Sequence, residues 1–98
     1  MLEIYTSAYW LIRHRFDYKE TLENFCNFGD RVTIAINTWA DGTWDAINQW
    51  KIDKKANHLN ILSCDFDRND PLFDGKVKNF ALKNTFRYTY FSLLIWNE

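Results

Sequence analysis

The amino-acid sequence predicts an α/β fold: a Rossmann-like, three-layer domain with the element order βαβαβαβ and a mostly parallel four-stranded sheet. Short segments rich in β-branched residues alternate with segments whose apolar residues recur at helical spacing. The helical segments are about ten residues long, which suits right-handed crossovers between parallel strands. The 98 residues are enough for one domain and too few for two, so the prediction covers the whole chain.

The first third of the chain predicts a strand, a helix and a second strand. Residues Leu2–Ala8 alternate and are rich in β-formers, whereas residues 9–16 fit either a loop or a short helix. A helix is expected over Tyr18–Phe28, with Gly29 as its stop. Its N-cap would be Asp17, and its apolar face Leu22, Phe25 and Cys26. Arg31–Thr38 is apolar almost throughout, which is typical of a strand covered on both faces.

The middle of the chain predicts a second helix and a third strand. Asp41–Gly42 is expected to form a turn, and Trp39 before it fits either a pocket lining or a cap on the sheet. The helix that follows has its buried face at Trp44, Ile47 and Trp50 and ends in Lys51, Lys54 and Lys55. Lysines suit the negative end of a helix dipole. A third strand is expected over His58–Phe66, with His58 exposed at its start.

The last third of the chain predicts a third helix and a fourth strand. A loop over Asp67–Gly75 leads into a helix over Lys76–Asn84, and a strand over Tyr88–Trp96 follows. The helix is expected to face inward with Val77, Phe80, Ala81 and, at the margin, Leu82. Ligands of parallel sheets bind beyond the carboxyl ends of the strands, so the polar residues that follow each strand are the candidates for a site.

The composition describes a globular chain and excludes two classes of partner. Hydrophobic residues make up 47% and charged residues 26% of the chain, and the formal net charge is -1. A balanced charge gives no electrostatic reason to bind nucleic acid or an anionic membrane. The longest largely apolar run, near Phe91–Trp96, is too short to span a membrane. Cys26 and Cys64 lack metal-type spacing, so we expect buried free thiols in a reducing, cytoplasmic compartment.

An acidic segment after the third predicted strand begins like a calcium loop. Asp65, Asp67 and Asn69 have the required spacing. The sixth and twelfth positions, however, carry Asp70 and Lys76 in place of glycine and glutamate, so the pattern fails. A solvated acidic turn is the simpler interpretation, and a ligand-facing role for Asp65 or Asp67 is the alternative.

Four short patterns line up along this element order: "EIYTSAY" (Glu3–Tyr9), "VTIAINTWADGT" (Val32–Thr43), "LNILSCDFD" (Leu59–Asp67) and "DGKVKNFAL" (Asp74–Leu82). Together they resemble the N-terminal, nucleotide-binding half of family 2-like glycosyltransferases with the GT-A fold. The last pattern is similar to that family's Gly-x-x-x-Arg-Asn-x-Ala-Leu helix. In this match Gly75 stands at the glycine, Lys78 at the basic position and Asn79 at the asparagine.

The resemblance implies a domain that binds a nucleotide-sugar donor such as a UDP-sugar. The nucleobase and ribose would contact residues at or just beyond the carboxyl ends of the first three strands, namely Thr6, Ser7, Tyr9, Asn37 and Asp67. Gly75, Lys78 and Asn79 would meet the diphosphate. A glycine lets a ligand approach the backbone, a helix N-terminus favours phosphate, and a cation one turn later neutralises it.

The chain departs from the family pattern at the fourth strand. There the family carries an Asp-x-Asp-type motif whose carboxylates hold Mn²⁺ or Mg²⁺ on the sugar diphosphate. Here Ile95 and Asn97 stand at the aspartates and Glu98 at a following glutamate, so Asn97 and Glu98 are weak metal-ligand candidates and the ion is expected to be lost. Lys78 also lacks the bidentate fork of an arginine.

The family's acceptor-binding half and general base would follow Glu98, so the resemblance implies a domain that is incomplete for catalysis. The alternative function is a non-catalytic interaction or oligomerisation module that kept the fold and lost the metal site. A sheet that stops at its fourth strand has an open edge, and open edges pair with further chains. That alternative predicts a homo-oligomer formed through the sheet edge.

Overall fold

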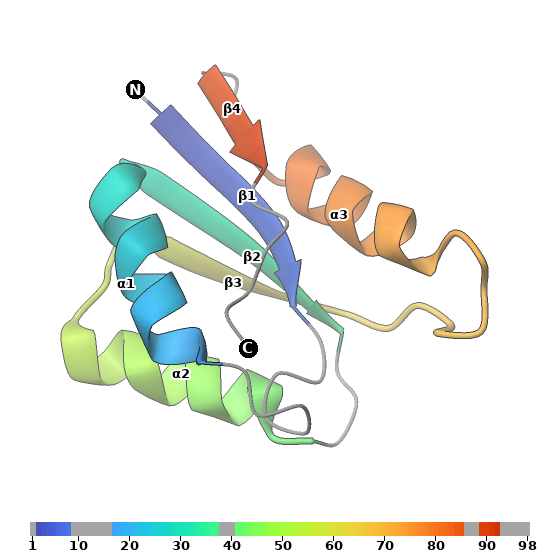
Figure 1. The fold of residues 1–98 in the computed structure, drawn as a ribbon, viewed down its shortest axis with the longest axis horizontal. Helices are drawn as coiled ribbons and strands as arrows, with labels where there is room; N and C mark the ends of the chain where they lie inside the picture. Colours follow the sequence, from blue (N-terminus) through green and yellow to red (C-terminus); the bar gives the residue numbers. More distant parts are fainter. Residues whose placement is uncertain (1, 9–16, 38–40, 86–88, 93–98) are drawn as a thin grey trace.

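The computed structural model of the chain describes residues 2–8, 17–37, 41–85 and 89–92 (Figure 1). In chain order the elements are β1 (Leu2–Ala8), α1 (Tyr18–Phe28), β2 (Arg31–Asn37), α2 (Thr43–Lys54), β3 (Leu59–Cys64), α3 (Phe73–Lys83) and β4 (Thr89–Ser92). The prediction of an α/β fold with three helices and a parallel sheet is confirmed. Residues 9–16 and Trp39, for which the sequence left two interpretations open, lie outside the described residues.

The sheet has the strand order β3-β2-β1-β4, and each pairing is parallel. Its body is made by β1, β2 and β3, with Thr6 opposite Ile34 and Ile34 opposite Ile61. The short β4 pairs with the first half of β1, where Leu2 lies opposite Thr89. It covers four residues of the strand predicted over Tyr88–Trp96. The chain thus adds strands outward from β1 and then crosses back to the other side of β1.

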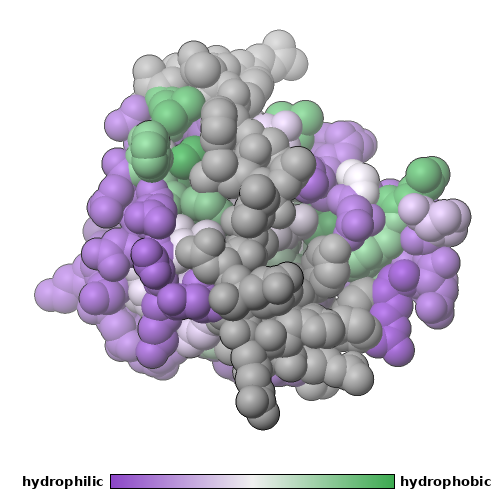
Figure 2. Space-filling view, viewed as in Figure 1, coloured by the Kyte–Doolittle hydropathy of each residue, from purple (hydrophilic) through white to green (hydrophobic). Residues whose placement is uncertain are grey.

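The helices form two layers, one on each face of the sheet. One cluster of buried residues joins α1 and α2 to Ile4, Val32 and Ile34, and a second joins α3 to Ala35 and Cys64. Because side chains alternate along a strand, neighbouring β2 residues enter opposite clusters. The prediction that β2 is covered on both faces is confirmed, since every residue from Val32 to Asn37 is buried. The outer surface over α1 and α2 is mostly hydrophilic (Figure 2).

Helix α1 has the predicted bounds, but its caps work differently from the prediction. The Asp17 carboxylate makes no capping hydrogen bond, and instead the Asp17 carbonyl accepts the Thr21 hydroxyl at 3.2 Å. Gly29 ends the helix as predicted. A Cβ there would lie 3.0 Å from Ile4 Cδ1 and 3.1 Å from the Arg31 carbonyl oxygen. The close packing at the turn into β2 therefore favours a residue without a side chain.

Helix α2 begins after the predicted Asp41–Gly42 turn. Gly42 adopts φ 87°, a left-handed conformation that glycine tolerates, and the Asp41 carboxylate accepts the Thr43 N–H at 3.0 Å. Ile47 and Trp50 are buried and Trp44 is partly buried, as predicted. No helix in the described part of the chain is long and apolar enough to cross a membrane.

Helix α3 begins at Phe73, three residues before the predicted Lys76, because Asp70 organises its start. The Asp70 carboxylate accepts the Leu72 N–H at 2.9 Å and pairs with the Lys76 ammonium, and the Asp70 carbonyl accepts the Phe73 N–H. The hydrogen bond from Lys76, with a second from Leu72, lowers the pKa of Asp70. The bonds that Asp70 makes at the start of α3 therefore persist at neutral pH and are lost as the pH falls below 3.8, when the carboxylate takes up a proton. Phe73 is buried, a core position that the sequence prediction missed.

His58 is half-buried rather than exposed. Its Nε2 lies 2.9 Å from the Cys26 carbonyl oxygen, so it connects the last turn of α1 to the start of β3. No local sequence pattern indicates this contact, because Cys26 and His58 are 32 residues apart. The two cysteines are free thiols: Cys64 is buried as predicted, whereas Cys26 is only half-buried.

Both thiols are expected to react slowly with disulfide reagents at neutral pH. Burial raises the pKa of Cys26 and of Cys64 from 9.0 to about 11, and the charge of Asp65 adds to the effect at Cys64. About a thousandth of each thiol is then thiolate at pH 8. The labelling rate should rise about tenfold per pH unit up to pH 10, which stopped-flow absorbance can follow. Because folding favours the protonated thiols, their contribution to stability is lost as the pH rises from 9.0 toward 11.

Glutathione is the control, since its rate should level off near its own lower pKa. A protein rate that also levels off below pH 9.0 would contradict the raised pKa of the two thiols.

Candidate functional site

The candidate residues on β1 point to opposite faces of the sheet. Thr6 lies on the face that also carries Ile4, and Ser7 lies on the face that also carries Tyr5, which packs with the α3 cluster. Thr6 is buried, and its hydroxyl lies 3.5 Å from the Ser7 carbonyl oxygen. Only Ser7 therefore shares a face with α3 and its phosphate-side candidates. Tyr9 lies outside the described residues.

Asn37 holds two strand ends together at the carboxyl edge of the sheet. Its side chain is 2% exposed. The amide oxygen accepts the Phe66 N–H at 2.8 Å, and the amide nitrogen donates to the Phe66 carbonyl at 3.2 Å. Cys64 Sγ also lies 3.5 Å from the same oxygen. Asn37 thus fixes the path of the loop that leaves β3, a role that the sequence prediction of a nucleoside contact did not include.

Asp67 lies exposed in that loop and organises a turn. Its carboxylate accepts the Asn69 N–H at 2.9 Å, and its carbonyl accepts the Asp70 N–H at 3.1 Å. These bonds match the interpretation of a solvated acidic turn. Among the residues that the structure describes, no three His, Cys, Asp or Glu side chains are grouped to hold a metal ion. Asn97 and Glu98, the weak metal-ligand candidates, lie outside those residues.

The phosphate-side candidates lie on α3. Gly75 is the third residue of the helix, so it lies inside the first turn rather than in the predicted loop. Lys78 is half-buried and Asn79 is exposed, both in the second turn. Gly75 also precedes Lys78 by three positions, one fewer than in the family pattern, so the match is looser than the residue types alone indicate.

Replacing Gly75 by alanine is expected to stabilise the free protein by about 0.5–1 kcal/mol. Glycine loses more backbone entropy than alanine when a helix forms. A Cβ at Gly75 would have nothing within 4 Å, so no strain opposes this gain. Urea unfolding measures the effect. A destabilised Gly75→Ala variant would show that the position needs glycine for a reason other than a ligand.

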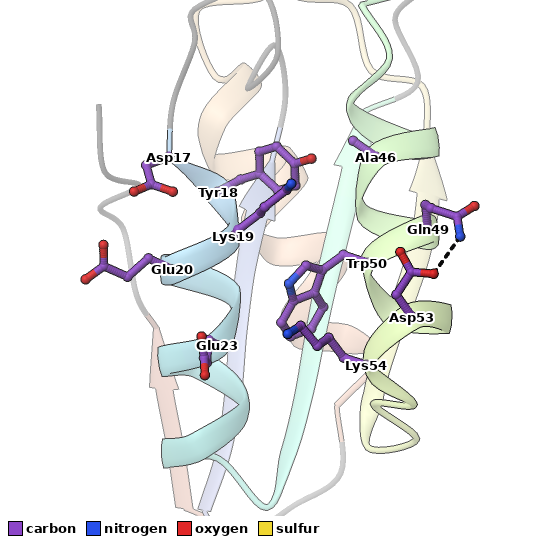
Figure 3. Close-up of a pocket in the computed structure, with 10 residues that line it drawn as sticks. All are labelled: Asp17, Tyr18, Lys19, Glu20, Glu23, Ala46, Gln49, Trp50, Asp53 and Lys54. Atoms are coloured by element: carbon purple, nitrogen blue, oxygen red, sulfur yellow. Dashed lines mark hydrogen bonds between the residues drawn. The ribbon is translucent and has the colours of Figure 1, made fainter.

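A groove between α1 and α2 is a feature that the sequence prediction missed (Figure 3). Its volume is about 610 Å³, and Tyr18 and Trp50 contribute aromatic rings to its lining. Four acidic residues also line the groove: Asp17, Glu20, Glu23 and Asp53. The one sequence feature related to this groove is the cluster of acidic residues around the first turns of the helix at Tyr18–Phe28. By itself such a cluster indicates a solvated helix face.

Comparisons with protein-family models, with curated proteins and with solved structures found no match.

Proposed function

We propose that this chain is a glycosyltransferase-like domain that binds a nucleotide-sugar donor at the carboxyl edge of its sheet, between β1 and β4. The strand order carries the proposal. The chain winds outward through β1, β2 and β3 and then reverses direction to place β4 beside β1. In doubly wound sheets, ligands bind outside the carboxyl ends of the strands at this point of reversal.

The position of α3 supports a diphosphate on the same side. Helix α3 follows the carboxyl end of β3, and the loop between them is fixed by Asn37 and Asp70. The first turn of a helix carries backbone N–H groups and a positive partial charge, both of which favour phosphate. Lys78, in the next turn, supplies the cation, and Ser7 lies on the face of β1 that α3 covers.

The proposal concerns donor binding, and ligand-induced stabilisation tests it. Five millimolar UDP, about ten times an expected Kd of 0.5 mM, stabilises the fold by about 1.4 kcal/mol. For a domain of this size that is a rise of about 6–10 °C in melting temperature. Lys78→Gln should remove at least half of the rise. The matched control is Lys83→Gln in the last turn of α3, which should leave the rise unchanged.

Two results would overturn the proposal. One is an unchanged melting temperature with UDP, GDP and their sugar derivatives, with and without Mn²⁺. The other is an equal loss of the rise in Lys78→Gln and Lys83→Gln, which indicates attraction to net charge rather than a site. Gly75→Ala provides an independent test of whether the ligand contacts the backbone at Gly75. If it does, the free variant is still more stable than the original chain, but UDP no longer raises its melting temperature.

A second candidate, the oligomerisation module, is favoured by one observation at the other edge of the sheet. Strand β3 is an outer strand, and Ile61 and Leu62, which point to its two faces, are both only half-buried. Pairing with β3 of a second copy would cover both side chains. Light scattering should then report a dimer that Ile61→Lys dissociates. Weak pairing becomes visible at concentrations of about 10 µM to 1 mM. A monomer at every concentration in that range would exclude this candidate.

A further inference from the structure

The outer edge of β3 lacks the features that normally prevent strands from pairing between molecules. Among the described residues β3 pairs with β2 alone, and it is the last strand on its side of the sheet (Figure 1). The strand Leu59–Cys64 contains no charged residue and no proline. Natural sheets protect their edges with such residues, so this edge is open to a further strand.

The backbone groups that face this edge belong to alternate residues. The His58 carbonyl accepts the Val32 N–H at 3.0 Å, so it points toward β2. Because backbone groups alternate in direction along a strand, those of Ile61 and Ser63 point to the open edge. Two antiparallel copies bring these same groups face to face, as a hydrogen-bonded pair requires. A symmetric parallel pair would need the groups of the residues in between, which face β2.

The two ends of β3 carry opposite charge. Lys54 and Lys55 precede the strand and give +2, whereas Asp65, Asp67 and Arg68 follow it and together give -1. The side chains of both lysines and both aspartates are exposed. In an antiparallel pair the basic end of each copy lies beside the acidic end of the other, whereas a parallel pair brings like charges together. The strand is therefore complementary in charge to a second, antiparallel copy of itself.

Apolar side chains that a second copy can cover lie on both faces of this edge. Ile61 packs against the cluster under α1 and α2, and Leu62 points to the face of α3. Both are half-buried. A two-fold axis perpendicular to the sheet keeps each face on its own side, so the same two helical layers continue across the pair.

We propose that two copies of this chain pair antiparallel along β3 about such a two-fold axis, and that ion pairs between the ends of the strands hold this orientation. The inference rests on the second candidate function, pairing through β3, and adds the orientation and a dependence on salt. The carboxyl edges of the two sheets then point in opposite directions. The nucleotide site proposed between β1 and β4 stays open in each copy.

Sedimentation equilibrium of the full chain tests the charge contacts. We expect a dimer whose Kd rises about tenfold between about 0.05 M and about 0.5 M salt, because salt screens exposed ion pairs. Lys54→Glu combined with Lys55→Glu should weaken the dimer about tenfold at low salt, and so should Asp65→Lys. An equal mixture of the two variants should form a heterodimer, since acidic and basic ends again meet.

The matched control is Lys19→Glu combined with Lys83→Glu. It changes the net charge as much as the double lysine variant, but both lysines are exposed on α1 and α3, outside β3. Its Kd should change less than about twofold.

Disulfide trapping tests the orientation directly. A two-fold axis through the middle of β3 passes at Ile61 or Leu62, so one of Ile61→Cys and Leu62→Cys should link to its own copy under mild oxidation. Ser63→Cys should not, although Ser63 is exposed. Its Cα would lie at least about 8 Å from its copy, and a disulfide spans less than about 7 Å. The unchanged chain, with its two free thiols, is the control.

The possible failures are distinguishable. A monomer at every concentration would overturn this inference together with the oligomerisation candidate. A dimer that strengthens with salt, that keeps its Kd in the charge-reversed variants, or that is linked by Ser63→Cys would overturn the antiparallel orientation alone. An equal loss of affinity in the Lys19 and Lys83 variant would also overturn it, because net charge rather than the ends of β3 would then control pairing.

Discussion

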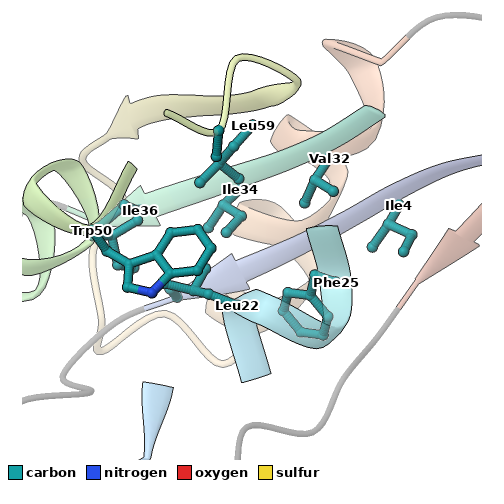
Figure 4. Close-up of a cluster of buried hydrophobic side chains, with 11 residues drawn as sticks. Ile4, Leu22, Phe25, Val32, Ile34, Ile36, Trp50 and Leu59 are labelled. Carbon is teal, nitrogen blue, oxygen red and sulfur yellow. The ribbon is translucent and has the colours of Figure 1, made fainter. Parts of the chain in front are cut away.

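Replacing Ile34 by alanine is expected to lower the free energy of unfolding by about 2–5 kcal/mol. Ile34 is 0% exposed and lies at the centre of β2, between Thr6 of β1 and Ile61 of β3. It belongs to the cluster that joins the sheet to α1 and α2 (Figure 4). Because hydrogen-bonded strands flank it on both sides, the backbone cannot close the cavity that the variant leaves. Urea unfolding followed by circular dichroism measures the loss.

The matched control is the same substitution at Ile52, which is 67% exposed on α2. Ile52→Ala should change the free energy of unfolding by less than about 0.5 kcal/mol. A loss at Ile34 no larger than the change at Ile52 would contradict the packing described for β2.

Replacing Asn37 by alanine is expected to lower the free energy of unfolding by about 1–3 kcal/mol. The variant removes both hydrogen bonds between the Asn37 side chain and Phe66. The backbone N–H and carbonyl of Phe66 then lose these partners at a partly buried position. Unsatisfied groups of this kind lose the hydration that they had in the unfolded chain and gain nothing in return. Thermal unfolding gives the size of the effect.

Asn79→Ala is the control for Asn37→Ala, because Asn79 is exposed on α3 and alanine is a better helix former. It should leave the stability of the free protein unchanged or slightly higher. Equal stability of the two variants would show that the Phe66 contact contributes nothing to the fold.

The two asparagines also separate two contributions to the proposed nucleotide site. Asn37→Ala should weaken UDP binding indirectly, because the loop that carries Asp67 and leads to α3 loses its anchor. Asn79→Ala should weaken it directly if the side chain meets phosphate. A comparison of the loss in UDP affinity with the loss in stability, variant by variant, distinguishes the roles.

Sequence alone was sufficient for the element types and for several bounds. The bounds of β1 and α1 agree with the prediction, because alternating β-formers and a helical repeat of Leu22 and Phe25 are local signals. The parallel arrangement followed from the helices between the strands, and Gly29 marked a real helix end. These features depend on neighbours a few residues away, which the sequence displays directly.

Tertiary structure decided where the chemistry of the chain lies. Asn37 bonds to Phe66, 29 residues further on, and His58 contacts Cys26 across 32 residues. The groove exists only because α1 and α2 pack on the same face of the sheet, and both helices contribute residues to its lining. Such contacts are set by packing between elements rather than by local propensity, so no pattern within one segment could reveal them.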